Sequence, residues 1–590
     1  MNYFNSIKKI NIFILLISFC IGFVVYIYPL KNISLGYDTW WIFFIQSSSR
    51  DIVFPSFYNY IGIEPENIVA SGISLFDYFG RFSFIDWARF WLLAQVFENH
   101  PVIWRSVAVL SMSISLFYWV KIYRILSISK LSLSIVYIIL LTDPQSLWLD
   151  WNKSESVAFL FFSISSYYYL SVKNKAKYFS VAMLIISILV KETFIIAIPF
   201  LIFIRAYKKK EFPNQSYYSK LFYYFNENKL LLIFGFFYSI IITIFTLLID
   251  HEKSYVLQGN TNDVANNINL DFFFAIFKLI IPIQFHNLLN SISVLAILST
   301  MIFFVFFTNF IKRIFKHNFT LSNGSIKNIT NKKLDIYILP LLSFLAITII
   351  LLLFGNIARR YASPINIIII TSAILIYPVV KLYIFKLVKN ELLIRYIDYF
   401  VYLILIFPFF ILVSKFSLYV SVILLLFLLV YFLICKSKKY IYFAIIVLFL
   451  IPSIDRTIVN ITVTKSIYES WDDINTNTIF SLPENSVIEI SLSEQLTIEQ
   501  AVSLEVNSVF NNRGDIVYFI DENKAKNLLF IDEHDFWHIQ KFNMNKDFSE
   551  DNNFYIFRLL ENKNTTTINN ILERYDKYKN RYSYSIRKLN

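Results

Sequence analysis

Charged residues beside long apolar runs are the first candidates for chemistry in this chain, because a charge at or near a bilayer is costly and usually marks function. Asp38 stands in the stretch 35–41, LGYDTWW, shortly after the first apolar run. Aromatic neighbours exclude water from a carboxylate, which makes it a better proton acceptor. Asp38 therefore suits a general base, although it could equally cap a following helix. Asp51, beside Arg50, is a weaker second candidate, for which a surface ion pair is the simpler interpretation.

A group of carboxylates lies in the loop between the third and fourth apolar runs. Asp143, Asp150 and Glu155 fall close together there, with Lys153 among them. Oxygen ligands at this density can bind a divalent cation. A solvated loop that ends in a helix cap explains the same residues without a metal. No cofactor is certain from the sequence, and a divalent metal is the option that these carboxylates raise.

Basic residues stand at two further places near the predicted outer surface. Lys191 and Glu192 interrupt the apolar run 181–203. A buried pair there would face the bundle interior or a polar cavity, and a short interfacial loop is the alternative. Arg359 and Arg360 follow the ninth apolar run, and the fork geometry of arginine suits phosphate. Snorkelling of both side chains to lipid headgroups is the alternative there.

The remaining motifs carry less chemistry. His534 and His538 have the i,i+4 spacing of a metal pair, but the glutamate of an H-E-x-x-H motif is missing between them. The chain also lacks a P-loop, a G-x-G-x-x-G fingerprint and a G-x-S-x-G elbow. The sequence therefore does not indicate an ATP-driven pump or a zinc hydrolase.

The composition indicates the elements that must position these residues. Hydrophobic residues make up 57% of the chain and charged residues only 16%, whereas soluble domains carry about 25% charged residues. An excess of this size needs lipid to cover it. Apolar runs of near spanning length, which is about 20 residues, occur at 10–30, 103–120, 131–148, 156–172, 178–191, 193–206, 230–249, 290–311, 335–355, 364–384, 397–414, 417–435 and 440–453.

The charges in the loops indicate the orientation of these spans. Lys8 and Lys9 precede the first run, and alternate loops from there on are rich in Lys and Arg. Basic loops stay on the cytoplasmic side, so the net charge of +13 is a topology signal and not a nucleic-acid patch. About 13 spans, an odd number, place the C-terminal end outside, and the chain is expected in a cell membrane, with a bacterial inner membrane favoured.

We expect a membrane all-α domain over 1–453 and a small extracytoplasmic α/β domain over 454–590. The first external loop, 31–101, is long and contains an amphipathic stretch at 84–91 that suits a helix in the headgroup layer. In the C-terminal part, strand-like runs at 486–492, 515–520 and 554–560 alternate with helical segments, one of them near 566–579. No internal repeat is visible, which argues against a transporter built from repeated halves.

This layout resembles the GT-C superfamily of membrane glycosyltransferases. The stretch around Asp38 looks like that family's early aspartate site, 189–193 (LVKET) like its Lys-Glu pair, and 359–364 (RRYASP) like its late external Arg-Tyr…Pro stretch. The chain departs from the family in lacking a D-x-D or D-E doublet at Asp38. Trp471 and the two aspartates after it are at best distantly similar to the Trp-Trp-Asp motif of oligosaccharyltransferases.

The resemblance implies transfer of a sugar from a polyprenyl-phosphate-linked donor to an envelope glycan, lipid or protein acceptor. Asp38 would accept the proton of the attacking hydroxyl, with inversion at the anomeric carbon. Arg359, Arg360 and Lys191 would stabilise the departing phosphate, with Glu192 and Asp51 in support. Membrane lipids would be the remaining partners. An O-antigen polymerase or ligase, and a transporter or flippase of envelope lipids, are the alternatives.

Overall fold

The computed structural model describes residues 13–33, 84–98, 100–128, 154–171, 174–191, 194–209, 226–240 and 457–589, with gaps inside several of these ranges. Isolated residues between 133 and 148 and between 367 and 375 are described as well. The predicted spans beyond residue 240 and the predicted helix near 566–579 lie outside the described part, apart from the few residues at 367–375.

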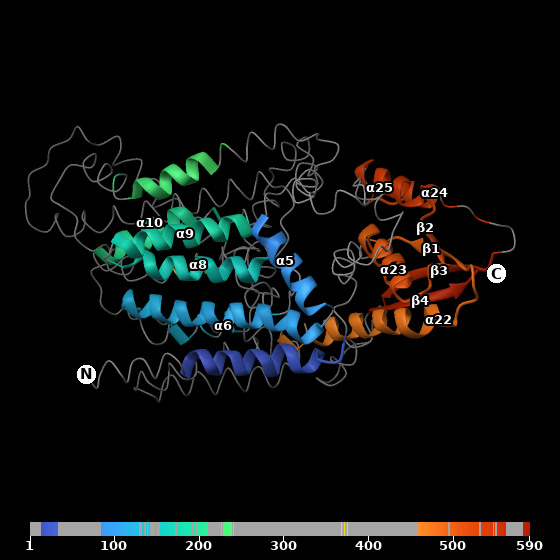
Figure 1. Ribbon diagram of the computed structural model, residues 1–590, viewed down its shortest axis with the longest axis horizontal. Helices are drawn as coiled ribbons and strands as arrows, with labels where there is room; N and C mark the ends of the chain where they lie inside the picture. Colours follow the sequence, from blue (N-terminus) through green and yellow to red (C-terminus); the bar gives the residue numbers. More distant parts are fainter. Residues whose placement is uncertain are drawn as a thin grey trace, which may run out of the picture.

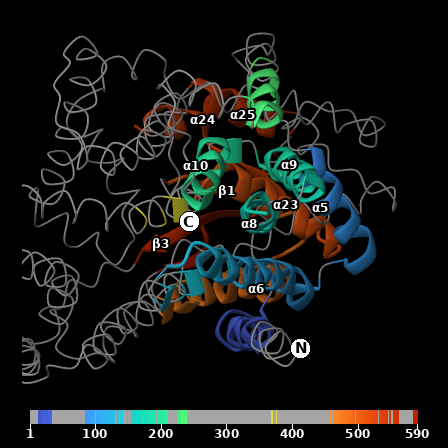
Figure 2. The same ribbon diagram turned by 90° about the vertical axis from the view of Figure 1, so that its left-hand side faces the viewer.

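The N-terminal half of the described chain is helical. The first helix is Phe13–Leu30, followed by α5 (Phe84–Phe97) and α6 (Pro101–Ile125). The helices α8 (Glu155–Tyr169), α9 (Asn174–Val190) and α10 (Ala197–Lys209) come next, and a shorter apolar helix covers Asn228–Tyr238. The first helix, α6, α8, α9 and α10 run side by side (Figures 1 and 2). The short connections between α8, α9 and α10 favour antiparallel neighbours.

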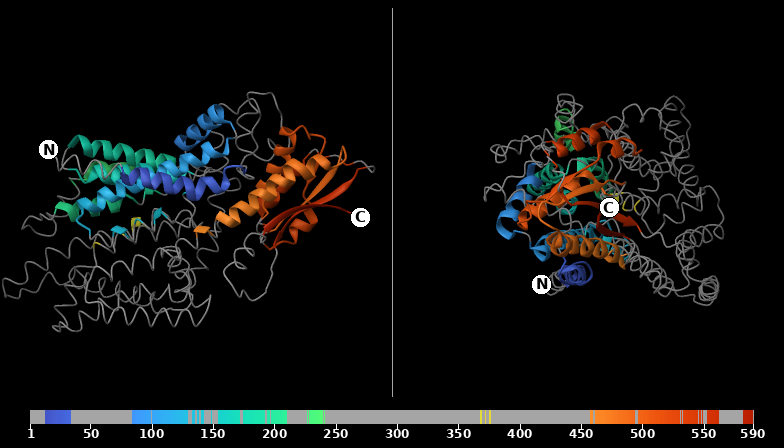
Figure 3. Two further views of the ribbon diagram at one scale, coloured as in Figure 1. Left: turned by 90° about the horizontal axis from the view of Figure 1, so that it is seen from below. Right: turned by 90° about the vertical axis from the view of Figure 1, so that its right-hand side faces the viewer.

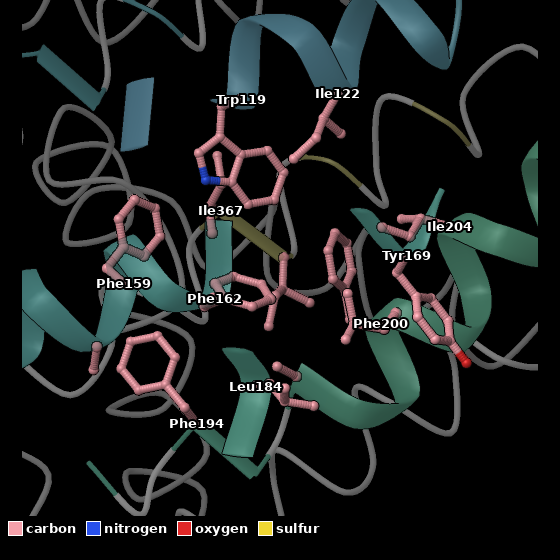
Figure 4. Packing of buried hydrophobic residues seen from close by; sticks show 14 of the residues in the cluster. Trp119, Ile122, Phe159, Phe162, Tyr169, Leu184, Phe194, Phe200, Ile204 and Ile367 are labelled. Atoms are coloured by element: carbon pink, nitrogen blue, oxygen red, sulfur yellow. The ribbon is translucent and has the colours of Figure 1, made fainter. Parts of the chain in front are cut away.

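Large aromatic side chains fill the space between these helices. Trp119 of α6 packs on Phe162 of α8 with ring centroids 5.8 Å apart, and Phe162 in turn contacts Phe194 and Phe200 at 5.8 and 5.9 Å. All four residues are buried (Figure 4). Tilted and edge-to-face rings at these distances pack favourably. The bundle therefore has a buried interior in which aromatic rings pack among aliphatic side chains.

The first helix packs on this bundle through a small residue. A Cβ atom on Gly22 would lie 2.5 Å from Cζ3 of Trp148 and 2.8 Å from Cγ1 of Val109, so only glycine permits the approach. Four residues on, Tyr26 stacks on Trp148 at 5.3 Å. Among the described residues, this helix and α6 are the two that are long and apolar enough to cross a membrane.

The C-terminal domain is built on a four-stranded sheet in the order β2-β1-β3-β4. Its strands are β1 (Val487–Ser491), β2 (Val517–Phe519), β3 (Phe554–Glu561) and β4 (Tyr582–Lys588). β1 pairs in parallel with β2 and β3, and β4 joins β3 antiparallel. The helices are α23 (Ile498–Phe510), α24 (Glu522–Lys526) and α25 (Glu533–Asn543). Figure 3 shows this domain at one end of the bundle.

A helical segment precedes the sheet of the C-terminal domain. Residues 461–473 are helical and continue through a π-helical turn, Ile474–Thr478, into α22 (Ile479–Ser481). Trp471 lies at the centre of the domain core, 5.0 Å from the ring of Tyr584 and 6.3 Å from that of Phe557. Trp471 is therefore a core residue, and the segment is part of the domain that it introduces.

The domain core also takes in two residues from the helical part. Ala94 of α5 and Trp104 of α6 are buried in the same cluster as Ile488, Val502 and Tyr518. Between α5 and α6 the chain turns at Glu98, whose φ is 47° and whose carbonyl accepts a hydrogen bond from Nε1 of Trp104 at 2.7 Å. The C-terminal domain thus packs directly on the α5–α6 corner.

The three strands predicted at 486–492, 515–520 and 554–560 are confirmed as β1, β2 and β3, whereas β4 was not predicted. Helices occupy the apolar runs predicted at 10–30, 103–120, 156–172, 178–191 and 193–206, and α5 includes the amphipathic stretch 84–91. The helices α8, α9 and α10 are shorter than the about 20 residues that a straight span needs.

Candidate functional site

A buried ion pair joins two residues that the sequence analysis assigned to separate roles. Nζ of Lys191 lies 3.3 Å from Oε1 of Glu155, and the two side chains are 7% and 2% exposed. Glu155 is the first residue of α8, and Lys191 directly follows the last residue of α9. Only four residues of sequence separate α8 from α9, so the two contacting helices are antiparallel neighbours and these two helix ends come together.

The helix ends themselves favour this arrangement of charges. A helix N-terminus carries a partial positive charge and a C-terminus a partial negative charge. The carboxylate of Glu155 therefore lies at a positive end and the ammonium of Lys191 at a negative end. Because each charge is stabilised both by its own helix and by its partner, the pair can remain ionised in a buried position.

Small polar residues surround the pair on both helices. Ser154 and Ser156 flank Glu155 and are buried. Oγ of Ser187, one turn before Lys191, donates to the carbonyl of Ala158 at 2.7 Å. The backbone N–H of Lys191 donates to the carbonyl of Ser187 at 2.9 Å. Serine residues allow α8 and α9 to approach closely, so the charged groups are held by a rigid hairpin.

The pair lies at the predicted outer end of the bundle. The first helix ends at Leu30, α6 begins at Pro101, and α9 ends at Val190, all on the side that faces the C-terminal domain (Figure 1). Helix α5 also packs against α9. The charged pair therefore lies at the end of the bundle nearest the C-terminal domain, on the helix that α5 contacts.

Seven of the predicted site residues fall outside the described part of the chain, and their placement stays a prediction: Asp38, Asp51, Asp143, Asp150, Glu192, Arg359 and Arg360. The structure therefore brings together Glu155 and Lys191, one from the predicted metal group and one from the predicted phosphate group. Among the described residues, no group of three or more His, Cys, Asp or Glu side chains could hold a metal ion.

Sequence reasoning missed a further buried charge, Arg105 in α6, which is 2% exposed. Its Nη1 donates to the carbonyl of Leu30 at 2.6 Å and to that of Ile33 at 2.9 Å. The signal was present, since Arg105 stands within the second predicted span, 103–120, where a charge is rare. It was overlooked because no motif surrounds it.

The histidine pair of the C-terminal domain is only partly described. His538 lies in α25, is buried, and stacks edge-on against Trp537 at 4.8 Å. His538 is thus surrounded by the domain interior, which suits a packing role.

No protein-family model, curated protein or solved structure matches this chain.

Proposed function

We propose that this chain is an integral membrane glycosyltransferase that moves a sugar from a polyprenyl-phosphate-linked donor to an envelope glycan, lipid or protein acceptor on the extracytoplasmic face. The observation that carries the proposal is the buried pair of Lys191 and Glu155 at the end of the bundle nearest the C-terminal domain. A charge pair of this kind is expensive to keep, so a functional role explains its presence better than packing alone.

A lipid environment is supported by the side chains on the outside of the bundle. On the first helix Phe13, Leu16 and Val24 are each more than half exposed, and only 28% of its most apolar window is buried. Phe236 and Phe237 are likewise more than half exposed on the helix Asn228–Tyr238. Apolar surface left in water costs about 25 cal/mol per Å², and lipid removes that cost.

The proposed reaction divides the work between a base and a set of cations. Asp38 accepts the proton from the acceptor hydroxyl as its oxygen attacks the anomeric carbon, and the bond from that carbon to the phosphate oxygen breaks. The polyprenyl phosphate leaves with the bonding electrons, so attack from the opposite face inverts the configuration. Arg359, Arg360 and Lys191 stabilise the negative charge on the leaving phosphate.

Glu155 has a defined part in this scheme. A single cation in an apolar bundle would be poorly stable, whereas one held against a carboxylate is kept ionised and fixed in place. Lys191 then adds positive potential near the leaving phosphate without having to be ordered when the donor arrives. Preorganised charge of this kind needs little rearrangement during the reaction.

The test uses the full-length chain in lipid nanodiscs, supplied with synthetic polyprenyl-phosphate sugars and a membrane extract as acceptor. We expect release of polyprenyl phosphate and a labelled product, and a loss of about 10²-fold or more in Asp38→Asn, since general bases contribute about 10² to 10⁴ in rate. Asp263→Asn, a matched change in the polar stretch between the predicted spans 230–249 and 290–311, serves as control. If no donor is consumed by the wild type, the transferase proposal is wrong. Full activity in Asp38→Asn would remove Asp38 as the base.

A further inference from the structure

Three aromatic rings surround the ammonium group of Lys121 on α6. Nζ of Lys121 lies 4.0 Å from the ring centroid of Phe117, one helical turn earlier, and 5.6 Å from that of Tyr118. The ring of Tyr167 on the neighbouring helix α8 lies 5.2 Å from the same atom. Aromatic faces within about 6 Å attract a cation. The ammonium group therefore has a defined position between α6 and α8, although the side chain that carries it is long.

The aromatic side chains continue from α6 across α8 to α9. The ring centroids of Tyr118 and Tyr167 are 5.4 Å apart, those of Tyr167 and Tyr168 are 5.2 Å apart, and Tyr168 lies 4.8 Å from Phe179 of α9. Helix α8 lies between α6 and α9 (Figures 1 and 2). Phe179 is 44% exposed and its neighbour Tyr178 is 65% exposed. Amphipathic rings in such a row are typical of the boundary between acyl chains and lipid headgroups. The aromatic band, as we call Phe117 and these three tyrosines with Phe179, thus reaches the surface of the bundle.

Lys121 differs from neighbouring cations in what it contacts. Nη1 of Arg205 donates to the carbonyl of Tyr169 at 2.7 Å, and Nζ of Lys208 donates to the carbonyl of Leu170. These two side chains therefore cap the C-terminal end of α8. No oxygen atom in the described part of the chain accepts a hydrogen bond from Lys121, whose contacts there are the three rings. An ammonium group has three N–H donors, so Lys121, which is only partly buried, still has donors for an anion.

The charges at this end of the bundle favour an anion. Helices α6, α8, α9 and α10 contain one carboxylate, that of Glu155, which begins α8 at the opposite end. Tyr167 and Tyr168 belong to the last turn of α8. The cations at the same end are Lys121, Arg124, Lys175, Lys177, Arg205 and Lys208. The predicted orientation places this end at the cytoplasmic leaflet, whose anionic lipids attract basic residues.

We propose that Lys121 and the aromatic band bind the phosphate group of an anionic phospholipid of the cytoplasmic leaflet. The ammonium group donates to the phosphate oxygens, and the exposed rings of Phe179 and Tyr178 pack along the acyl chains. A zwitterionic lipid fits less well, because Lys121 already occupies the three rings and no described carboxylate at this end would receive the headgroup cation. This inference rests on the membrane setting of the proposed function and is independent of its reaction.

The first experiment titrates the full-length chain in detergent micelles with dioleoyl-phosphatidylglycerol and counts the bound lipids by native mass spectrometry. We expect Lys121→Gln to weaken the tightest binding step by about fivefold, the effect of one lysine near an anionic lipid surface. Lys121→Arg keeps the charge and should stay within about twofold of the wild type. Lys175→Gln removes an exposed charge from the same end of the bundle and is the matched control. Equal weakening in Lys121→Gln and Lys175→Gln, or none in either, would overturn the proposal.

Competing probes distinguish a lipid from a soluble phosphate. Dioleoyl-phosphatidylcholine has the same acyl chains and should bind several-fold more weakly, and millimolar inorganic phosphate should not displace the bound phosphatidylglycerol. Displacement by inorganic phosphate would assign the site to a soluble anion and overturn the lipid, and equal affinity for the two lipids would overturn the anionic preference.

A ring variant tests the part of the aromatic band while the charge of Lys121 is kept. Tyr167→Leu should weaken binding of phosphatidylglycerol by about twofold to fivefold, the range expected for one cation–π contact at a partly exposed site. Tyr178→Leu, which keeps an apolar side chain outside the three rings, is the control. An unchanged affinity in Tyr167→Leu would contradict the role of the rings.

The leaflet is tested separately. In a variant that carries Cys20→Ser and Cys435→Ser, the further change Lys175→Cys places one thiol at this end of the bundle. A membrane-impermeant maleimide should modify it in inverted membrane vesicles and not in right-side-out vesicles. The reverse labelling would overturn the assignment to the cytoplasmic leaflet. An inactive wild type that shows the expected lipid binding and labelling would remove the transferase and leave this site.

Discussion

Two largely buried lysine–glutamate pairs occur among the described residues, one in the helical bundle and one in the C-terminal domain. Lys191 and Glu155 are 3.3 Å apart at two helix ends. Lys546 and Glu505 are 3.6 Å apart beside the sheet, with side chains 6% and 15% exposed. Lys546 also donates to the carbonyl of Tyr518 and lies 3.5 Å from the ring centroid of Phe542.

The surroundings of Lys546 and Lys191 differ, and the difference indicates different roles for the two side chains. Lys546 connects a strand carbonyl, a helix carboxylate and an aromatic ring within one small core, and its burial lowers its pKa despite the opposing effect of Glu505. Lys191 lies at the end of a bundle, among serines and helix termini. The same two residue types therefore serve as an internal cross-link in the domain and, in our proposal, as a preorganised charge in the bundle.

The largest effect is expected from breaking the bundle pair. Lys191→Met and Glu155→Gln each leave one buried charge or polar group without its ionic partner and should cost about 3–5 kcal/mol in the free energy of unfolding. The double change Glu155→Met with Lys191→Met should restore most of that stability. Transfer activity in the double variant should still fall by about 10²-fold, as expected for the loss of one stabilising donor. Thermal unfolding and donor turnover in nanodiscs measure the two effects, and wild-type turnover in the double variant would make the pair purely structural.

Breaking the pair of Lys546 and Glu505 should lower the stability of the C-terminal domain and leave the turnover nearly unchanged. Lys546→Met should destabilise the C-terminal domain by up to about 3–5 kcal/mol, because Glu505 loses its counter-charge in a mostly buried position. Hydrogen exchange in peptides from α23 and β2 should accelerate, whereas turnover per folded molecule should stay within about twofold. A specific loss of turnover in a domain that still exchanges slowly would mean that Lys546 takes part in the reaction.

A smaller difference in stability is expected between alanine substitutions at one glycine of the bundle and one glycine of the C-terminal domain. Gly22→Ala should cost about 1–3 kcal/mol, the usual range for overpacking, because its Cβ would meet Trp148 and Val109 at less than 3 Å. Gly514→Ala is the matched control in the C-terminal domain, since the nearest atom to its Cβ is Cγ2 of Val509 at 3.8 Å. Thermal unfolding of both variants measures the difference, and equal midpoints would show that the first helix does not pack on α6 as described.

The smallest expected effect is a pH dependence confined to the domain. Arg513 donates from Nε and Nη2 to the carboxylate of Asp515, and this pairing lowers the pKa of Asp515 below its usual 3.8. The contribution to stability is therefore complete above pH 3.8 and is lost as the pH falls through the lowered value. Hydrogen exchange of residues 482–487 should rise over that acid range in the wild type and be less dependent on pH in Asp515→Asn. Identical pH profiles would contradict the account.

Continuous apolar runs made part of the C-terminal domain predictable. β1, β2 and β3 consist mainly of apolar residues, whereas β4, at one edge of the sheet, reads Tyr-Ser-Tyr-Ser-Ile-Arg-Lys. Edge strands carry polar and charged residues, and the serines and the final Arg-Lys leave β4 without such an apolar run. β4 is held instead by the stacking of Tyr584 on Phe557 at 5.6 Å, a contact between distant residues that no local pattern contains.

The candidate site was predictable only in its parts. Lys191 and Glu155 are each recognisable in the sequence as a charge beside an apolar run. Because Glu192 adjoins Lys191 in sequence, the sequence suggests Glu192 as its partner in place of the more distant Glu155. The antiparallel hairpin of α8 and α9 makes the start of one helix adjacent to the end of the other, and this rule would have suggested the pair. The contact of Arg105 with Leu30 and Ile33 depends on how three separate segments pack, so the sequence alone does not contain it.

The most direct test of the central claim is the release of polyprenyl phosphate from a synthetic lipid-linked sugar by the full-length protein in nanodiscs. The account predicts release that depends on an acceptor, falls by about 10²-fold in Asp38→Asn, and falls similarly in the stable double variant Glu155→Met with Lys191→Met. Release that is absent in the wild type, or unchanged in both variants, would contradict it.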